Sequence, residues 1–471
     1  MHIIPTPKKA EKRAEPCSFQ ASVCGGAAFE EAISAFVDYA QKLGVDFERK
    51  EGGAICVQAD AALAAGAYRL DVQETGITLF AQDITGAHHG FATILQLLQP
   101  ADEAAFTMPL GYVEDAGDCE YRSLMVDLSR VWRSFDYLLH YVDMCYFYKV
   151  ATLQLHFTDS QSFTLPSKAY PKLSTKDRHY TFEEIAQLVS YALERGVDLV
   201  PELDVPGHSA AFREAYPRLF CHADIIPYQE NAIRAVQTLF REICAMFPYS
   251  KYIHIGGDEA DLSQWTSCEE CSAYGKSKGL ETAEEWLADF ICEMASVVFE
   301  EGKTPIVWEG FKPAVNSMIS KDIPVMSWEN FYQLTPDLLD AGFKVINCSW
   351  NPMYIFMPCA DRCSLRDSYD WTIYQWTPVH PKSPYIGSTL EIQPTDAVMG
   401  GQLLVWSDGI LSTYPDDPEK ISECIVLEND ELIRRLPYLA ENTWNIDKRI
   451  SFEEFSACAE NLNERLRQIM N

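Results

Sequence analysis

The stretch that decides the fold, KYIHIGGDE at residues 251–259, is a short apolar run that ends in two glycines and two acids. Successive side chains of a β-strand point to opposite faces of the sheet. Two neighbouring carboxylates therefore cannot both point the same way from a regular strand. The chain must leave strand geometry at Asp258 and Glu259, and the preceding glycine pair lowers the cost of that departure.

This run is the fourth of eight similar ones that follow Arg122. The runs are SLMVDLS (123–129), ATLQLHFTD (151–159), VDLVPELD (197–204), KYIHIGGDE (251–259), TPIVWEG (304–310), IPVMSWEN (323–330), FKVINCSW (343–350) and GGQLLVWSD (400–408). Helical patterns separate most of them, at Phe135–Tyr148, Phe182–Arg195, Glu230–Phe247, Thr282–Glu301 and Pro336–Ala341, and another follows at Pro418–Leu439. Strands that alternate with helices predict a parallel sheet, and eight such units predict an α/β fold of the (β/α)8 TIM barrel type.

The first 115 residues have a different pattern. The periodicity predicts helices at Phe29–Leu43 and His89–Leu98 and strands at Ala54–Gln58, Tyr68–Gln73 and Ile77–Ala81. We interpret this part as a small α/β domain and Pro100–Asp118 as a linker. The predicted domains are residues 1–115, a catalytic barrel over 116–415 and a C-terminal helical segment over 416–471.

Composition limits the partners of the protein. The chain has 471 residues and a formal net charge of −31, which disfavours nucleic acid and anionic membranes as partners. The N-terminus has no apolar core of signal-peptide length, so we expect a cytoplasmic location and read the 15 cysteines as reduced thiols. A zinc site built from Cys268–Cys271 and Cys359–Cys363 is disfavoured. The second pair is poorly spaced, and no histidine-rich segment lies beside either pair.

Acids and tryptophans gather where the predicted strands end. In a barrel of this kind the carboxyl ends of the strands form the active site. One acid at a strand end is often a helix cap, but capping does not explain a set spread over nearly every strand. Flat tryptophan faces suit the C–H face of a sugar ring, and acids suit its hydroxyls, so the set predicts glycoside hydrolysis. Its members are His156, Asp159, Glu202, Asp204, His208, Asp258, Glu259, Trp308, Glu309, Trp328, Glu329, Trp350, Trp406 and Asp408.

Five segments make the sequence resemble the glycoside hydrolase family 20 β-N-acetylhexosaminidases over nearly its whole length. IHIGGDEA (253–260) is similar to the catalytic signature of that family. The others are YRSLMVDLSR (121–130), LHFTDSQSF (155–163), PELDVPGHSAAF (201–212) and GAHHGFATILQLLQ (86–99). The resemblance implies an exo-acting, retaining enzyme that removes terminal β-linked N-acetylglucosamine by substrate-assisted catalysis and needs no cofactor or metal.

The resemblance also implies roles for individual residues. Glu259 would be the general acid and base, and Asp258 would orient the substrate's acetamido group and stabilise its charge. The remaining implied site residues are Arg122 for the sugar's 3- and 4-hydroxyls, Tyr354 for the acetamido oxygen, Trp308, Trp328 and Trp406 for the pocket walls, Asp159 and His208 for a relay behind the acid, and Asp408 near the outer hydroxyls.

Three positions depart from the family pattern. Ser160 and Phe356 stand where the family often has acids, and Asp408 stands where it has a glutamate. These positions contact the outer hydroxyls of the terminal sugar. The departures leave the reaction intact, but they leave open whether the enzyme also accepts N-acetylgalactosamine or 6-substituted sugars.

Two other functions stay open at this point. A metal-dependent barrel hydrolase could use His156, Asp159, His208, His254 and Asp258 as ligands, although it would leave the tryptophans unexplained. A catalytically inactive sugar-binding barrel would have no need of a general acid. The expected partner is a carbohydrate with a terminal N-acetylhexosamine, and the sequence leaves a homodimer open.

Overall fold

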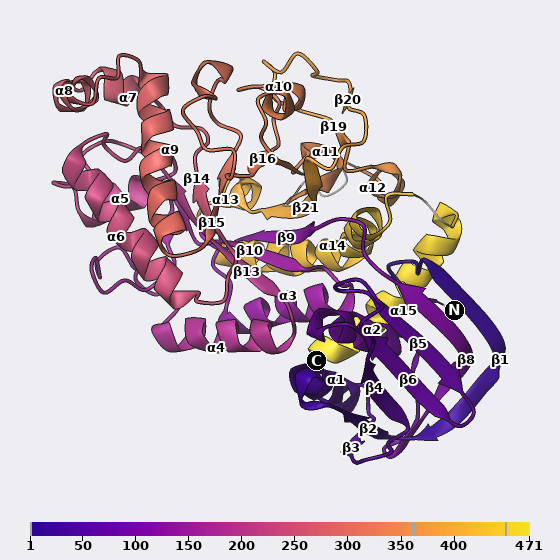
Figure 1. Cartoon of the computed structure of the whole chain (residues 1–471). Helices are drawn as coiled ribbons and strands as arrows, with labels where there is room; N and C mark the ends of the chain where they lie inside the picture. The colour runs from indigo at the N-terminus through magenta and orange to yellow at the C-terminus, as the bar shows by residue number, and fades with distance from the viewer. Residues whose placement is uncertain (1, 359–362, 448–449) are drawn as a thin grey trace.

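The chain folds as a parallel β-barrel with a separate N-terminal sheet packed beside it (Figure 1). The computed structural model describes residues 2–358, 363–447 and 450–471. Among the described helices, none has both the length and the apolar character needed to cross a membrane.

Each of the eight predicted runs contains one strand of a closed parallel barrel. The strands are β9 (Tyr121–Asp127), β10 (Thr152–His156), β13 (Asp198–Val205), β14 (Tyr252–Gly256), β15 (Thr304–Trp308), β16 (Val325–Ser327), β17 (Val345–Asn347) and β21 (Val398–Trp406). They pair in chain order, and β21 pairs with β9 to close the barrel. The predicted TIM barrel is therefore confirmed.

Helices cover the outside of the barrel. They include α3 (Phe135–Phe147), α4 (Phe182–Glu194), α6 (Glu230–Met246), α9 (Ala283–Glu300), α10 (Thr335–Asp340), α14 (Pro418–Trp444) and α15 (Phe452–Met470). After β15 there is only the 3-10 turn η2 (Pro313–Val315), so the fifth unit lacks a full helix. The long helix α14 packs against β21 and β9. The domain boundaries given above stay predictions.

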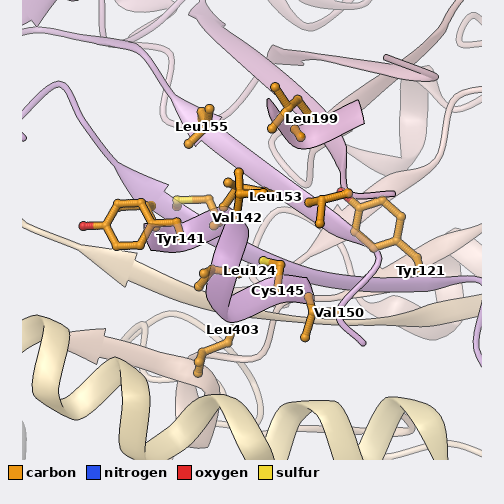
Figure 2. Packing of buried hydrophobic residues seen from close by; sticks show 14 of the residues in the cluster. Tyr121, Leu124, Tyr141, Val142, Cys145, Val150, Leu153, Leu155, Leu199 and Leu403 are labelled. Carbon is orange, nitrogen blue, oxygen red and sulfur yellow. The ribbon is translucent and has the colours of Figure 1, made fainter. Parts of the chain in front are cut away.

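Alternation along the strands separates an apolar outer layer from a polar interior. Leu153 and Leu155 of β10 face outward and pack with Val142 of α3 (Figure 2). Between them Gln154 faces inward, where its amide donates to Glu202 Oε2 at 2.8 Å. The barrel interior is thus a hydrogen-bonded column rather than a purely apolar core, and it leads toward the carboxyl ends of the strands.

The N-terminal sheet is larger than predicted. Its order is β1-β8-β5-β6-β4-β2-β3, with β7 paired to β8. The strands are β1 (Lys9–Gln20), β2 (Ser22–Gly25), β3 (Glu48–Arg49), β4 (Ile55–Ala59), β5 (Tyr68–Gln73), β6 (Gly76–Ala81), β7 (Gln99–Asp102) and β8 (Ala105–Asp115). The linker prediction is wrong, because most of Pro100–Asp118 forms β7 and β8. The segment contains Pro109 and Gly111, residue types that are typical of linkers, and both lie within β8.

Two helices of the N-terminal domain, α1 (Glu30–Lys42) and α2 (Ile84–Leu97), lie between the sheet and the barrel. Helix α2 begins at Ile84, five residues before its predicted start, and Asp83 is its N-cap. Across the interface the hydroxyl of Tyr39 donates to Asp143 Oδ1 at 2.6 Å and accepts from Arg195 Nε at 2.9 Å. This buried polar contact fixes the N-terminal domain against α3 and α4.

Candidate active site

A pocket with a cavity volume of about 170 Å³ opens at the carboxyl ends of the barrel strands. It is lined by Arg130, Asp204, His208, Asp258, Glu259, Trp308, Trp328, Glu329, Trp350, Tyr354, Phe356, Trp406 and Asp408. The pocket therefore combines six aromatic side chains with a ring of acids and two basic side chains.

The glycine pair after β14 turns the chain so that both neighbouring acids face this pocket. Gly256 and Gly257 have φ values of 73° and 110°, in the left-handed region. A Cβ on Gly256 would lie 2.1 Å from Asp204 Oδ1, and one on Gly257 would lie 2.5 Å from Val307 Cγ2. Glu259 itself has φ of 46°, a conformation that non-glycine residues rarely adopt. Strained backbone of this kind is common at functional sites.

Asp258 is a buried carboxylate with one uncommitted oxygen. The residue is 8 % exposed, and among the described residues no group hydrogen-bonds its Oδ1. Burial raises the pKa of Asp258 to about 7, and the negative charge of Glu259 adds to the shift. A buried polar atom without a partner is costly, so this oxygen is suited to a ligand that donates a hydrogen bond.

Glu259 lies at the end of a chain of charged contacts. His208 Nε2 is 3.3 Å from Glu259 Oε2, and His208 Nδ1 is 3.3 Å from Asp159 Oδ1. Burial opposes the charged form of His208, but Asp159 and Asp204 raise its pKa well above the usual value. The hydrogen bond from His208 lowers the pKa of Glu259. The Glu259 side chain is 52 % exposed, so it can reach a ligand in the pocket.

Indole rings form the walls of the pocket, and hydrogen bonds hold Trp308 and Trp328 in place. Trp308 Nε1 donates to Glu202 Oε1 at 2.6 Å, which ties this wall to the polar interior of the barrel. The ring of Trp406 lies 6.1 Å from that of Trp308 and 6.3 Å from that of Tyr354. These faces enclose the space next to Asp258.

The wall formed by Trp328 rests on a second buried acid. Glu309 accepts backbone N–H groups from four residues of the next loop: Trp328, Asn330, Phe331 and Tyr332. Trp328 Nε1 also donates to the carbonyl oxygen of Glu309 at 3.0 Å. Burial raises the pKa of Glu309 to about 7. Glu309 thus positions one side of the pocket without lining it.

Two family models match the chain. Residues 119–445 match the model described as glycosyl hydrolase family 20, catalytic domain, and residues 1–116 match that family's domain 2. The chain belongs to glycosyl hydrolase family 20.

Among curated proteins of similar sequence, the beta-hexosaminidase of Akkermansia muciniphila is 30 % identical over 275 residues, which is 52 % of this chain and 56 % of that protein. The beta-hexosaminidase subunit beta of Entamoeba histolytica is 27 % identical over 373 residues, or 73 % of this chain and 65 % of that protein. This chain thus spans less than two thirds of the length of either relative.

A solved structure shares the fold over nearly the entire chain. It is the family 20 exo beta-N-acetylglucosaminidase of Vibrio harveyi in complex with N-acetylglucosamine. The TM-score is 0.83 at 22 % identity, and the match covers 99 % of this chain and 77 % of that one.

The fold places most of the residues implied by the resemblance to family 20 in one pocket. Eight of them line it: His208, Asp258, Glu259, Trp308, Trp328, Tyr354, Trp406 and Asp408. Asp159 lies behind it, in contact with His208 and Arg130. Phe356 also lines the pocket, whereas Ser160 lies outside it and donates to Asp224.

Arg122 does not reach the pocket, so its predicted role as the hydroxyl-reading arginine is wrong. It is the second residue of β9, at the opposite end of the barrel, where it donates to the carbonyl oxygens of Cys119 at 2.7 Å and Lys149 at 3.2 Å. Arg130 lines the pocket instead, because it follows the carboxyl end of β9. Its guanidinium lies 2.7 Å from Asp159 Oδ2 and over the ring of Trp406.

Three further pocket residues were in the strand-end set but were not assigned as site residues: Asp204, Glu329 and Trp350. Asp204 is buried, and among the described residues its Oδ1 has no hydrogen-bond partner. Burial raises the pKa of Glu329 to about 7. The position of each at or just beyond the carboxyl end of a strand is the signal that could have identified them.

Two matched variants can test whether Arg130, and not Arg122, contacts the substrate. We expect Arg130→Lys to lower kcat/KM on an aryl N-acetylglucosaminide by about 10- to 100-fold, the loss typical of hydrogen bonds to a charged group. We expect Arg122→Lys to leave KM unchanged and to lower Tm, because its guanidinium bonds two backbone carbonyls and lies over the ring of Trp444, away from the pocket. Steady-state kinetics and thermal unfolding give both results. A raised KM in Arg122→Lys alone would contradict the assignment.

Proposed function

We propose that this family 20 protein is a retaining β-N-acetylhexosaminidase that removes terminal β-linked N-acetylglucosamine by substrate-assisted catalysis. The proposal rests on one observation above all. The buried Asp258 carboxylate turns an oxygen without a partner in the described chain toward a pocket with aromatic walls. An acetamido N–H is a donor that fits such an oxygen, and the acetamido group is the nucleophile of this family.

The first step follows from the two acids. The acetamido oxygen forms a bond to the anomeric carbon while the bond from that carbon to the leaving oxygen breaks. Glu259 gives its proton to the leaving oxygen, and ionised Asp258 holds the acetamido N–H and stabilises the positive charge of the oxazolinium ion. In the second step Glu259 takes a proton from water while the water oxygen bonds to the anomeric carbon and the bond from that carbon to the acetamido oxygen breaks. This opens the oxazolinium ring and restores the original configuration.

Before the reaction, Asp258 and Glu259 together carry the proton that the leaving oxygen will receive. Their carboxylates and the imidazole of His208 have atoms within 4.8 Å of one another. In the free enzyme the proton rests on Asp258, because burial raises its pKa while His208 stabilises the Glu259 anion. Substrate binding requires ionised Asp258, so the proton passes to Glu259, where the reaction needs it.

Two observations support this function over the metal-dependent and inactive alternatives. Asp159, Asp204 and His208 have atoms close enough to hold a metal. However, both imidazole nitrogens of His208 already contact carboxylates, and a metal would have to displace one of these contacts. An inactive binding protein would not need a strained, half-exposed Glu259 beside a buried Asp258.

The outer part of the pocket supports a tolerant enzyme. Phe356 lines it at a position where an acid would otherwise bind hydroxyls. Arg130 and Asp408 remain as polar groups there. We therefore propose weaker discrimination at C4 or C6 of the sugar, with some activity on N-acetylgalactosaminide or 6-substituted substrates. The pocket is consistent with exo action on one terminal sugar.

A panel of nitrophenyl glycosides tests the proposed function. We expect cleavage of the β-N-acetylglucosaminide, weaker cleavage of the β-N-acetylgalactosaminide and of a 6-substituted analogue, and none of the β-glucoside. Good activity on the β-glucoside, or a sugar ester trapped on an Asp or Glu, would exclude the acetamido nucleophile. Strict rejection of every C4 and C6 variant would show that Arg130 and Asp408 suffice to select the ring.

The shared proton predicts a bell-shaped pH profile of kcat/KM. The active form carries one proton on the pair, so activity falls on the acid side, where both acids are neutral, and on the alkaline side, where both are ionised. The alkaline limb should lie near the pKa of Asp258, which burial raises to about 7. In Asp258→Asn the neighbouring charge is gone, which lowers the pKa of Glu259. The alkaline limb should then move to lower pH, and an unmoved limb would show that the two acids titrate independently.

A further inference from the structure

A histidine and two cysteines converge on the catalytic face but outside the active-site pocket. His222 lies in the loop between α5 (Ala210–Ala215) and α6, and Cys268 and Cys271 begin α8 (Glu269–Ser277). Their potential ligand atoms all lie within 4.8 Å of one another. His222 lies far from this CxxC pair in the sequence, and only the fold brings it to the two cysteines.

The spacing of these atoms fits tetrahedral zinc. Zn–S bonds of ~2.3 Å and Zn–N bonds of ~2.0–2.1 Å at a tetrahedral angle place sulfur and nitrogen about 3.6 Å apart. Cys271 Sγ lies 3.8 Å from His222 Nε2. The other ring nitrogen, Nδ1, is buried and has no hydrogen-bond partner among the described residues. The ring therefore already presents Nε2 toward the thiols.

Hydrogen-bond donors surround the two sulfurs as they do in thiolate metal sites. The backbone N–H of Cys271 donates to Cys268 Sγ at 3.4 Å. The side-chain amide of Gln229 donates to both sulfurs, at 3.7 Å and 3.9 Å. Cys268 is also the N-cap of α8, where the helix dipole favours a negative charge. Donors of this kind stabilise thiolates and orient the ligands of a metal.

Cys221 supplies a candidate fourth ligand. It precedes His222 in the chain and is exposed, so its side chain is free to turn. Structural zinc sites with three cysteines and one histidine are common. In the protonated state Cys268 donates to Glu270, an exposed side chain that can turn to solvent when the thiol loses its proton.

We propose that His222, Cys268 and Cys271 bind a structural zinc ion, with Cys221 as the fourth ligand. The ion would join the loop after β13, which carries His208, to the loop after β14, which carries Glu259. Its role would be to hold these loops, not to take part in the reaction. Each bound cysteine would release its proton as the zinc–sulfur bond forms. The proposal adds a metal where the sequence analysis expected none.

A redox pair is the main competing interpretation, because CxxC at a helix N-terminus is also typical of disulfide exchange. One feature favours metal. A redox pair has no use for His222 Nε2 beside Cys271. Intact-mass measurement distinguishes the two, since a disulfide lowers the mass by two hydrogens.

Zinc content of the full-length protein, made with zinc in the medium and measured by native mass spectrometry, tests the proposal. We expect about one zinc ion per chain in the wild type. We expect loss of zinc in His222→Ala, Cys268→Ser and Cys271→Ser, and retention in the matched control Cys292→Ser. Cys292 is also partly buried, and a serine can keep its hydrogen bond to the carbonyl oxygen of Met318. Retention of zinc in Cys221→Ser would assign the fourth position to water instead.

A second measurement does not depend on folding of the variants. Wild-type protein stripped with a chelator and refilled with cobalt should show thiolate-to-cobalt charge-transfer absorption, and stripping should lower Tm by a few degrees. Activity measured well below that Tm should change less than about twofold, because the reaction residues are elsewhere. Zinc-free wild-type protein with freely alkylated Cys268 and Cys271, or a Cys268–Cys271 disulfide in freshly purified protein, would overturn the proposal.

Discussion

Glu259→Gln lowers kcat by about two to four orders of magnitude on substrates with poor leaving groups, the range expected for loss of a general acid. Glutamine keeps the shape of the side chain and its contact with His208, but it has no proton to give to the leaving oxygen. The loss should be much smaller on a nitrophenyl glycoside, whose leaving group hardly needs protonation. Steady-state kinetics on a chitobiose-type substrate and on the nitrophenyl glycoside give the comparison.

Glu329→Gln is the matched control, because Glu329 lines the same pocket and has a raised pKa but makes no contact with His208. Its effect should be similar on both substrates. If Glu259→Gln also lost the same factor on both, Glu259 would not be the proton donor.

Asp258→Asn should lower kcat by about 100- to 1,000-fold on the acetamido substrate, comparable to the loss of one preorganised electrostatic stabiliser. Asparagine fits the same buried space, but it carries no charge to stabilise the oxazolinium ion. Tm should change little or rise, since burial already disfavours the charge of Asp258. Kinetics and thermal unfolding of the same preparation separate the chemical effect from the structural one.

A thiazoline that mimics the cyclised intermediate sharpens this test. It should inhibit the wild type far more strongly than substrate binds, as intermediate-like ligands do, and inhibit Asp258→Asn much less. Asp408→Asn should weaken the binding of the thiazoline and of the substrate by a similar factor, because both carry the sugar hydroxyls near this carboxylate. Equal inhibition of wild type and Asp258→Asn would separate Asp258 from the acetamido group.

The barrel could be predicted because each of its strands is a compact apolar run followed by polar residues, and parallel strands need little else from the sequence. The N-terminal sheet was harder to predict from the sequence. Strand β1 is exposed along most of its length and carries two lysines, one arginine and two glutamates, so it has no apolar face to detect. Strand β8 is interrupted by Pro109 and Gly111, although its buried residues largely alternate.

The site was predictable where residues stand directly after strands, and most of the predicted set does line one pocket. The error at Arg122 came from choosing between the two arginines of one segment, YRSLMVDLSR at residues 121–130. Arg122 is the second residue of β9, so its side chain faces outward and lies at the amino end of the strand, far from the pocket. Arg130 follows the carboxyl end of the same strand. The partner of the CxxC pair could not be predicted, because His222 meets it only through the packing of two loops. Cys359 lies outside the described residues, so the prediction about the Cys359–Cys363 pair stays untested.

Glu309 has a consequence for how such an enzyme can acquire new specificity. It holds the loop at residues 328–332 through backbone N–H groups, which every residue except proline possesses. These backbone contacts therefore make no demand on the side chains of Glu329, Phe331 or Tyr332, although the first two also contact His380. Mutations at these three positions can reshape the pocket edge while the wall stays in place. A directed-evolution library should randomise them and keep Glu309 fixed, because its loss would release the whole segment at once.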